Sequence, residues 1–446
     1  MVISGFPRRL MCTAFVVLTL IAWPPGGWVQ AADAPAAPAA APAPVAADGG
    51  AAQPILKKGD RLAIVGDSIT EQKLYSRYME DYLTACMPHL ELWVIQLGWG
   101  GESAGGFLNR MNDDLLSFHP TVVTTCYGMN DGGYRAYNED IGRNYGNAMK
   151  ALVTRAKGAG ALVVVGSPGA VDTEFFRGVK PEIYNDNLAH LRDIDRKLAA
   201  DEQMVFANVH DAMIKTMEAA KAALGKGYPV CGRDGFHPSP NGHVIMAYAF
   251  LKAMGLDGHI GTFTVDMNGS AKATDGHKVL SAADGKIEIE SQRYPFCFYG
   301  DEKNPDSTRS IVPFVPFNND LNRLMLVVEN LKTDKAKVTW GKETRSFTRD
   351  QLAKGINLAA EFPENPFSEA FRKVDEQVAQ EQAFETTMIK TLYRSLGAFQ
   401  GCLDDEEGKA AIKTLRARLV AKQEALRAAV RAAVVPVRHT VTIVAE

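Results

Sequence analysis

Cysteine is scarce in this sequence, and charge of neither sign prevails. Six Cys in 446 residues are too few for a fold held together by disulfides. The 49 Lys and Arg nearly balance the 52 Asp and Glu, which gives a formal charge of -3. We therefore expect no nucleic-acid partner, because such proteins carry a basic surface. Hydrophobic residues make up 46% of the chain and charged residues 23%, which is typical of globular proteins and excludes a disordered or collagen-like chain.

The apolar run near the N-terminus, Met11–Trp23, is too short to span a bilayer comfortably. It follows Arg8 and Arg9, and Val29–Ala31 places small residues at the -3 and -1 positions of a cleavage site. This order predicts a Sec-type signal peptide over residues 1–31 and a secreted or periplasmic protein. We expect no stable membrane span after its removal, and an uncleaved signal anchor is the alternative.

Residues 32–53 consist mainly of Ala, Pro and Gly, with too little apolar bulk to offset their ordering entropy. They predict a flexible linker. The remaining chain is long enough for two domains at about 150 residues each. Because the sequence pattern changes near residue 258, we place one domain at 54–258 and the other at 259–446.

In the first domain, apolar strand-like runs alternate with helical segments such as Asp140–Lys157 and Glu182–Ala200. Strands that are apolar throughout indicate a parallel sheet covered on both faces. Right-handed crossovers then give an α/β fold, a three-layer α/β/α sandwich. The runs are Arg61–Gly66, Leu90–Leu97, Thr121–Tyr127, Ala161–Gly166 and Met204–Val209.

Polar loops follow these strands, on the side where such sheets bind ligands. Three of them directly follow a strand, and the fourth comes one helix after the last strand. We expect all four to converge on one cleft. They are Gly66–Thr70, Gly98–Ser103, Gly128–Asp131 and Asp234–Pro238.

These loops hold the parts needed for acyl transfer. A serine hydroxyl such as that of Ser68 needs a base, and His237 can take its proton. Asp234 lies three residues before that histidine and can hold its tautomer. The N–H groups of Ser68 and Gly101 and the amide of Asn130 could stabilise the oxyanion. Each motif alone also fits a cap or a turn, but four in order at strand ends favour catalysis.

The four motifs resemble the sequence blocks of the SGNH hydrolases, also called GDSL hydrolases. The resemblance covers about residues 55–256. The matching stretches are Gly66-Asp67-Ser68, Gln96–Glu102 with Gln96 where Asn is frequent, Gly128–Asp131 and Asp234–Pro238.

The resemblance implies Ser68 as nucleophile, His237 as base and Asp234 as its partner. It also implies Gly101 and Asn130 as oxyanion donors beside the Ser68 N–H, with Gly100 the alternative to Gly101. The implied fold is a flavodoxin-like α/β/α sandwich, and the implied chemistry needs no metal or cofactor. No metal-ligand cluster stands out in the sequence, and we interpret His210 and His243 as structural.

Ser103 is a rival nucleophile, because Gly101–Gly105 fits the G-x-S-x-G elbow of α/β-hydrolases. Only two predicted strands precede it, and it would leave Ser68 and Asn130 without a role. We therefore favour Ser68. Asp67 is favoured as a residue that fixes the loop over an acid. Trp99 either walls the substrate pocket or only packs. Tyr134 and Tyr137 either face a ligand or lie in a solvated loop.

The second domain has a different pattern, with short strands separated by Gly and Asp turns, which predicts an antiparallel β-rich module. Residues 366–434 read as a helical hairpin inserted into this module, and Arg438–Val444 as a returning strand. We expect the hairpin to pack on its own chain. Pro295–Tyr299 is aromatic enough for a sugar platform, although a buried strand or a domain interface is the favoured interpretation.

Together these features predict an exported serine ester hydrolase with a small-molecule or polysaccharide ester as substrate. Deacetylation of carbohydrate through an acyl-Ser68 intermediate is the favoured reaction. A lipase, lysophospholipase or thioesterase is an alternative, because fold and triad do not set specificity. The second alternative is a non-catalytic protein that binds glycan or envelope polymer.

Overall fold

The computed structural model describes residues 54–395 and 400–446. The predicted signal peptide (1–31) and linker (32–53) lie outside the described residues and stay predictions. No helix within the described part of the chain is long and apolar enough to cross a membrane. The five cysteines that the structure describes are free thiols, four of them buried.

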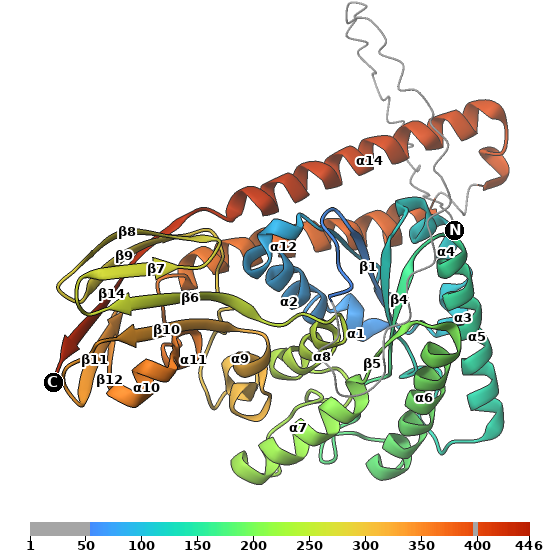
Figure 1. The fold of residues 1–446 in the computed structure, drawn as a ribbon. Helices are drawn as coiled ribbons and strands as arrows, with labels where there is room; N and C mark the ends of the chain where they lie inside the picture. Colours follow the sequence, from blue (N-terminus) through green and yellow to red (C-terminus); the bar gives the residue numbers. More distant parts are fainter. Residues whose placement is uncertain (1–53, 396–399) are drawn as a thin grey trace, which may run out of the picture. The chain divides into compact units, whose positions relative to one another are not determined.

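A five-stranded parallel sheet forms the centre of the first domain (Figure 1). Its order is β2-β1-β3-β4-β5, so each half of the sheet is wound outward from β1 and β3, as in flavodoxin-like folds. The predicted α/β/α fold is confirmed. The strands are β1 (Arg61–Gly66), β2 (Trp93–Gln96), β3 (Val122–Cys126), β4 (Leu162–Gly166) and β5 (Val205–Ala207).

Helices cover both faces of this sheet, because alternate strand residues pack into two separate cores. Leu62 and Ile64 of β1 face the core that includes α2, α7 and α8, whereas Ala63 and Val65 face α3–α5 and part of α6. The helices are α1 (Ser68–Glu71), α2 (Tyr75–Asp81), α3 (Ala104–Phe107), α4 (Met111–Asp114), α5 (Glu139–Gly158), α6 (Pro181–Glu202), α7 (Val209–Leu224) and α8 (Pro240–Ala253).

The C-terminal part contains two further sheets, of order β13-β10-β6-β7 and β12-β11-β14-β9-β8. The returning strand β14 pairs with both β9 and β11, as predicted for a strand that rejoins the β-module. The strands are β6 (His259–Asp266), β7 (Ser270–Ala273), β8 (His277–Ala283), β9 (Lys286–Ser291), β10 (Arg323–Glu329), β11 (Lys335–Trp340), β12 (Glu343–Thr348), β13 (Ile356–Asn357) and β14 (Val437–Ala445).

One strand pair differs from the antiparallel prediction. β6 and β10 are parallel, with Phe263 opposite Leu326. The chain between these two strands is long enough to return β10 in the same direction as β6, and a parallel pair requires such a crossover. Short turns predict only neighbouring hairpins such as β11–β12, where Trp340 lies opposite Glu343 across Gly341.

The helical hairpin packs on the first domain. Its first arm is α12 (Ser368–Thr387), which continues as a π-helical segment, Met388–Tyr393, and its second arm is α14 (Glu406–Ala433). α12 lies against α2 and the edge strand β2, and α14 lies along α12 (Figure 1). The hairpin therefore covers the open edge of the parallel sheet.

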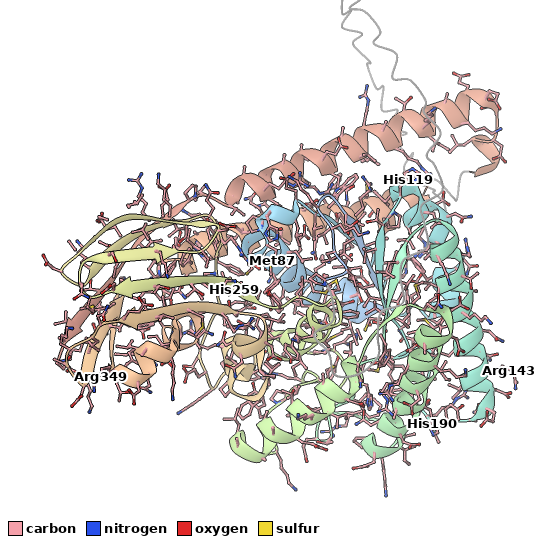
Figure 2. All side chains as sticks on the ribbon, in the orientation of Figure 1. Met87, His119, Arg143, His190, His259 and Arg349 are labelled. Carbon is pink, nitrogen blue, oxygen red and sulfur yellow. The ribbon has the colours of Figure 1, made fainter. Side chains whose placement is uncertain are left out.

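Arg293 links the two halves of the described chain at another point. Its guanidinium donates to the backbone carbonyl of His259, at the start of β6, and contacts the sulfur of Met87. Figure 2 labels Met87 and His259, the two residues that Arg293 joins. It also donates to the carbonyl of Cys86. The two predicted domains are thus joined by buried contacts; the boundary at 258 and 259 stays a prediction.

Candidate active site

Ser68 lies at the turn between β1 and α1, where the N–H groups of the first helical turn point outward. Asp67 caps this helix, and its carboxylate accepts from the Ile69 N–H at 3.0 Å. β1 is buried on both faces, so the position of the turn is fixed by the sheet. Ser68 itself is half-buried and its hydroxyl remains reachable.

His237 connects Ser68 to Asp234. The Nε2 atom of His237 lies 2.8 Å from the Ser68 hydroxyl, and its Nδ1 atom lies 2.7 Å from a carboxylate oxygen of Asp234. The carboxylate selects the tautomer in which Nδ1–H donates to it and Nε2 is free to accept the serine proton. The arrangement is that of a nucleophile, a base and a residue that orients the base.

The backbone holds Asp234 in place. Its other carboxylate oxygen accepts from the N–H groups of Phe236 at 3.1 Å and His237 at 2.9 Å. Partial burial raises the pKa of Asp234, but these two hydrogen bonds and the imidazole outweigh it, so the pKa lies below its ordinary value. Asp234 is therefore ionised at neutral pH, as an orienting carboxylate must be.

The three predicted oxyanion donors come from three different loops. Neither the Ser68 N–H nor the Gly101 N–H is used by another described residue. The Asn130 amide nitrogen donates to the Glu102 carbonyl at 3.0 Å, and its oxygen accepts from the Tyr134 hydroxyl at 3.1 Å. Tyr134 therefore fixes which end of the amide carries the N–H groups, a role that its position in a loop does not indicate.

The structure also distinguishes Gly100 from Gly101. The Gly100 N–H donates to the Glu71 carboxylate at 2.5 Å, so it is occupied. Gly101 has a φ of +73°, which favours glycine, and its N–H is the open donor of this turn. The choice of Gly101 over Gly100 as oxyanion donor stays a prediction.

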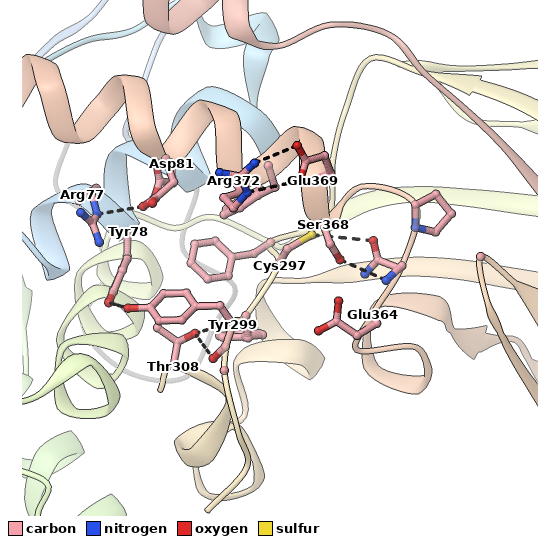
Figure 3. A pocket seen from close by; sticks show the side chains of 18 of the residues that line it. Arg77, Tyr78, Asp81, Cys297, Tyr299, Thr308, Glu364, Ser368, Glu369 and Arg372 are labelled. Atoms are coloured by element: carbon pink, nitrogen blue, oxygen red, sulfur yellow. Dashed lines mark hydrogen bonds and ion pairs between the residues drawn. The ribbon is translucent and has the colours of Figure 1, made fainter. Parts of the chain in front are cut away.

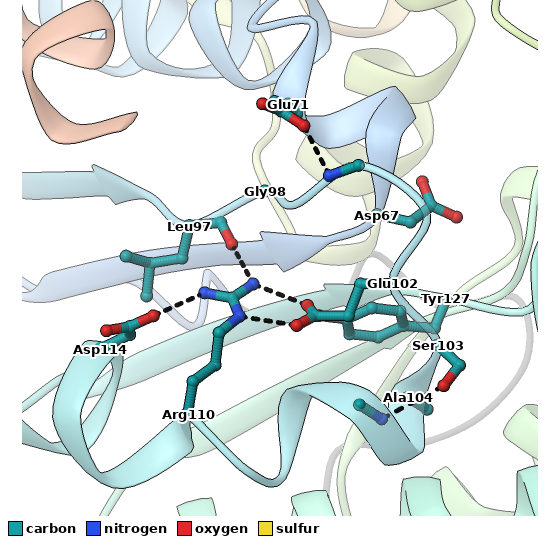
Figure 4. Close-up of polar contacts among 12 residues, drawn as sticks. Asp67, Glu71, Leu97, Gly98, Glu102, Ser103, Ala104, Arg110, Asp114 and Tyr127 are labelled. Atoms are coloured by element: carbon teal, nitrogen blue, oxygen red, sulfur yellow. Dashed lines mark hydrogen bonds and ion pairs between the residues drawn. The ribbon is translucent and has the colours of Figure 1, made fainter. Parts of the chain in front are cut away.

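The same loop is held by a partly buried ion pair that sequence reasoning missed (Figure 4). Arg110 donates to both carboxylate oxygens of Glu102, at 2.7 and 2.6 Å, and to the Leu97 carbonyl at 2.8 Å. The Tyr127 hydroxyl donates to Glu102 at 2.8 Å. No motif marks Arg110, because its role depends on the fold bringing the loop back over α4.

Asp67 and Asp131 are acidic side chains of the loops around the serine. Burial raises the pKa of Asp67 to about 7 and that of Asp131 to about 6. Asp131 accepts from the N–H groups of Ala104 and Gly128, both at 3.0 Å. Both residues therefore fix loops, which is the role that the sequence favours for Asp67.

Ser103, the rival nucleophile, caps a helix. Its hydroxyl accepts from the Gly106 N–H at 3.1 Å at the start of α3, whereas the imidazole of His237 lies at Ser68. His243 is fully buried, accepting from the Tyr75 N–H at 3.2 Å, and burial lowers its pKa to about 3. His210 is buried beside Asp211. Within residues 54–395 and 400–446, no group of three or more His, Cys, Asp or Glu side chains is arranged to hold a metal.

The aromatic segment Pro295–Tyr299 is mostly packed inside. Phe296 is 3% exposed and packs on Phe371 of α12, while Tyr299 is 42% exposed. The segment lines a cavity of about 760 Å³ beside α2 and α12, shown in Figure 3, where the Tyr299 hydroxyl lies 2.9 Å from that of Tyr78. The segment does not form a strand, so that part of the favoured interpretation is wrong. Residues 295–297 are buried, Phe298 is half-buried and Tyr299 is exposed.

Comparison with known proteins finds a family match within the first domain. Residues 64–245 match the model of the GDSL-like lipase/acylhydrolase family. The acetylxylan esterase of Geobacillus stearothermophilus is 22% identical over 224 residues, which is 45% of this chain and 95% of that protein.

A solved structure described as a gut microbial diltiazem-metabolizing enzyme is 21% identical and has a TM-score of 0.68. The match covers 89% of this chain and all of the other, so the shared fold extends beyond the α/β/α domain. The chain thus contains a GDSL-like lipase/acylhydrolase domain over residues 64–245 and is a carboxylic ester hydrolase.

Proposed function

We propose that this protein is an exported serine esterase in which Ser68 is the nucleophile, His237 the base and Asp234 its orienting partner. The observation that carries the proposal is the continuous pair of contacts from the Ser68 hydroxyl to His237 at 2.8 Å and from His237 to Asp234 at 2.7 Å. Acyl transfer needs these three groups in this order.

In the first half of the reaction, the Ser68 oxygen forms a bond to the acyl carbon while its proton passes to Nε2 of His237. The tetrahedral intermediate then collapses, its bond to the alcohol oxygen breaks, and His237 returns the proton to that oxygen. In the second half, water adds to the acyl carbon and gives its proton to His237. The acid leaves as the Ser68 oxygen recovers that proton.

Negative charge develops on the carbonyl oxygen in both halves. The N–H groups of Ser68 and Gly101 and the amide of Asn130 are the donors that would receive it. Each such donor typically contributes about 3 kcal/mol to lowering the barrier. Because the parallel sheet positions the strand ends from which these loops begin, the donors are in place before the charge forms.

We infer that the substrate is an O-acetyl ester of a carbohydrate. The support is the similarity to a protein named acetylxylan esterase and the predicted export of this chain, since polysaccharide outside the cytoplasm is accessible to a secreted enzyme. Esters with long acyl chains and thioesters are the alternatives that the test must separate.

The test is a panel of esters assayed with the purified chain and with Ser68→Ala as the blank. The panel contains p-nitrophenyl acetate and its longer-chain homologues, acetylated xylo-oligosaccharides, a lysophospholipid and an acyl thioester. We expect hydrolysis of the acetyl esters, with a loss of at least about a thousandfold in Ser68→Ala. A preference for long acyl chains or thioesters would overturn the acetyl-carbohydrate assignment and leave the esterase intact.

Ser103→Ala is the matched control. It removes a helix cap, so we expect a loss of about 1 kcal/mol in the free energy of unfolding with turnover retained. Activity that survives Ser68→Ala but not Ser103→Ala would reverse the assignment of the nucleophile. An acetyl group trapped on Ser68 and detected by mass spectrometry would support the acyl-serine step directly.

A further inference from the structure

The loop Gly98–Ser103 is connected to the C-terminal hairpin through the side chain of Glu71. Glu71 lies in the same helical turn as Ser68, and one of its carboxylate oxygens accepts from the Gly100 N–H at 2.5 Å. The other oxygen accepts from the Lys390 ammonium group, also at 2.5 Å. Lys390 belongs to the π-helical segment after α12, 319 residues further along the chain.

This contact matters because the loop has little stiffness of its own. Gly100 and Gly101 are adjacent, and glycine restricts the backbone less than any other residue. The Glu71 contact holds the turn at Gly100, and the Glu102 N–H closes it by donating to the Trp99 carbonyl at 3.2 Å. Between these two fixed points lies the Gly101 N–H, the donor proposed for the oxyanion.

The charge of Glu71 also needs a partner. A bare carboxylate beside the oxyanion site would oppose the negative charge that forms there during acyl transfer. Lys390 supplies a cation at direct contact, with the two side chains 30% and 25% exposed. Lys73 contributes a second positive charge, donating to the Glu71 carbonyl at 2.7 Å.

Lys390 is itself held by a docked element. Its neighbours Met388 and Ile389 are 2% and 1% exposed and belong to the core beneath the parallel sheet. Its ammonium nitrogen lies 4.9 Å from the centre of the Trp99 ring, which the Arg394 guanidinium also approaches at 5.4 Å. A cation on an aromatic face is stabilised. The Lys390 side chain is therefore held near the loop by two contacts, the Trp99 ring and the Glu71 carboxylate.

We propose that Lys390 is a positioning residue of the active site, acting through Glu71 to hold the Gly100–Gly101 turn and to neutralise the carboxylate beside it. The inference rests on the proposed function. It makes the C-terminal hairpin a component of the catalytic centre, although its sequence lies outside the GDSL-like domain. Neither residue touches the reacting atoms.

The first test compares Lys390→Met with the wild-type chain on p-nitrophenyl acetate. Removing an oxyanion donor costs a hundredfold or more, so a loosened donor should lower kcat about tenfold with KM changed less than about twofold. Lys390→Arg keeps the charge and should recover most of the loss. Lys373→Met, an exposed lysine on α12 that pairs with Glu369, is the matched control and should match the wild type.

A double-mutant cycle tests the path through Glu71. If Lys390 acts through that carboxylate, the losses of the two single variants overlap. The kcat of the double variant Glu71→Gln/Lys390→Met should then be at least about half the kcat of the slower single variant. Independent roles would multiply the two losses and would contradict the proposal. The fraction of active sites, titrated with a phosphonate ester, separates slower turnover from partial unfolding.

A readout that does not need turnover distinguishes this inference from the proposed function. Hydrogen exchange at residues 98–103, followed by mass spectrometry, should be faster in Lys390→Met and unchanged in Lys373→Met. Equal exchange and equal kcat in Lys390→Met and the wild type would overturn the positioning role. A wild-type chain without ester turnover would overturn the proposed function, and the exchange result would still decide whether Lys390 holds the loop.

Discussion

At the scale of single residues, the proposed base His237 is oriented by a carboxylate that is itself only partly shielded from water. Asp234 is 47% exposed at its side chain, against 28% for His237, so water competes for the hydrogen bond between them. Two backbone N–H groups compensate by fixing one carboxylate oxygen, which leaves the other aimed at Nδ1. The orientation of Asp234 toward His237 is therefore set by the backbone of the loop between them and not by burial.

We predict that Asp234→Asn lowers kcat about a hundredfold while leaving the melting temperature nearly unchanged. An amide keeps the shape but can present N–H instead of oxygen to Nδ1, which favours the wrong tautomer. Steady-state kinetics on p-nitrophenyl acetate measure the loss, with Asp201→Asn on the exposed end of α6 as control. Turnover within twofold of wild type in Asp234→Asn would remove Asp234 from the machinery.

The chemistry of individual residues could be predicted where a short motif marks it. Ser68 and Asn130 directly follow strands, and parallel strands bring their carboxyl ends to one edge. His237 belongs to a motif that comes one helix after the last strand. Glu71 and Lys390 could not, since an ion pair across 319 residues leaves no local signal. The same holds for Tyr134, whose contact with Asn130 depends on a positive φ of 55° in its loop.

At the scale of elements, a side chain of α12 accepts a backbone hydrogen bond from the edge strand of the parallel sheet. Glu385 accepts from the Gln96 N–H of the edge strand β2 at 2.8 Å and from the Gln423 amide of α14 at 2.7 Å. Near it, Gln382 donates to Glu80 of α2 at 2.8 Å, and Arg427 donates to Glu381 at 3.0 Å. Three carboxyl groups thus share a buried interface with one guanidinium.

This interface predicts that docking of the hairpin weakens as pH rises. Burial and the neighbouring Glu381 raise the pKa of Glu385 to about 8. In the unfolded chain a glutamate titrates near about 4.3, so between the two values the folded state binds more protons than the unfolded state. The contribution of Glu385 to stability is therefore fully present below about pH 4 and is lost as pH rises toward 8.

Glu385→Gln removes this titration, so its melting temperature should fall less between pH 5 and pH 8 than that of the wild type. For each kcal/mol by which the free energy of unfolding changes with pH, the melting temperature is expected to shift by about 2–4 °C. Glu376→Gln, an exposed glutamate on the same helix that pairs with Arg372, controls for the change in net charge. Parallel pH profiles for Glu385→Gln and the wild type would show that the buried carboxyl is not the titrating group.

At the scale of the whole molecule, the sequence predicts which helices and strands form better than it predicts how they pack against one another. Apolar periodicity is sufficient for the parallel sheet, the hairpin of α12 and α14, and the return of β14. It does not say which surface a helix covers, because any apolar stripe of suitable width satisfies the same pattern. The packing of α12 on β2 and the parallel pairing of β6 with β10 therefore appear only in the structure.

These contacts predict that the first domain does not fold stably without the rest. Tyr78 and Tyr82 of α2 and its continuation are 2% and 0% exposed, and the Tyr82 hydroxyl donates to the Leu321 carbonyl at 2.8 Å. Tyr78 packs edge-on against Phe296, at 6.3 Å between ring centres. A fragment ending at residue 258 would expose this aromatic surface and the N–H groups of β2, and such surfaces promote aggregation.

We therefore expect the fragment 54–258 to be recovered mostly in insoluble form, and any soluble fraction to lack a cooperative thermal transition. The chain 54–446, which lacks only the N-terminal segment, is the control and should unfold at the same temperature as the full protein. Co-expression of residues 259–446 should recover soluble fragment, because the missing surface is then supplied in trans. A monomeric 54–258 fragment with full esterase activity would instead mean that the hairpin and the β-sheets are accessory to catalysis, and Lys390 with them.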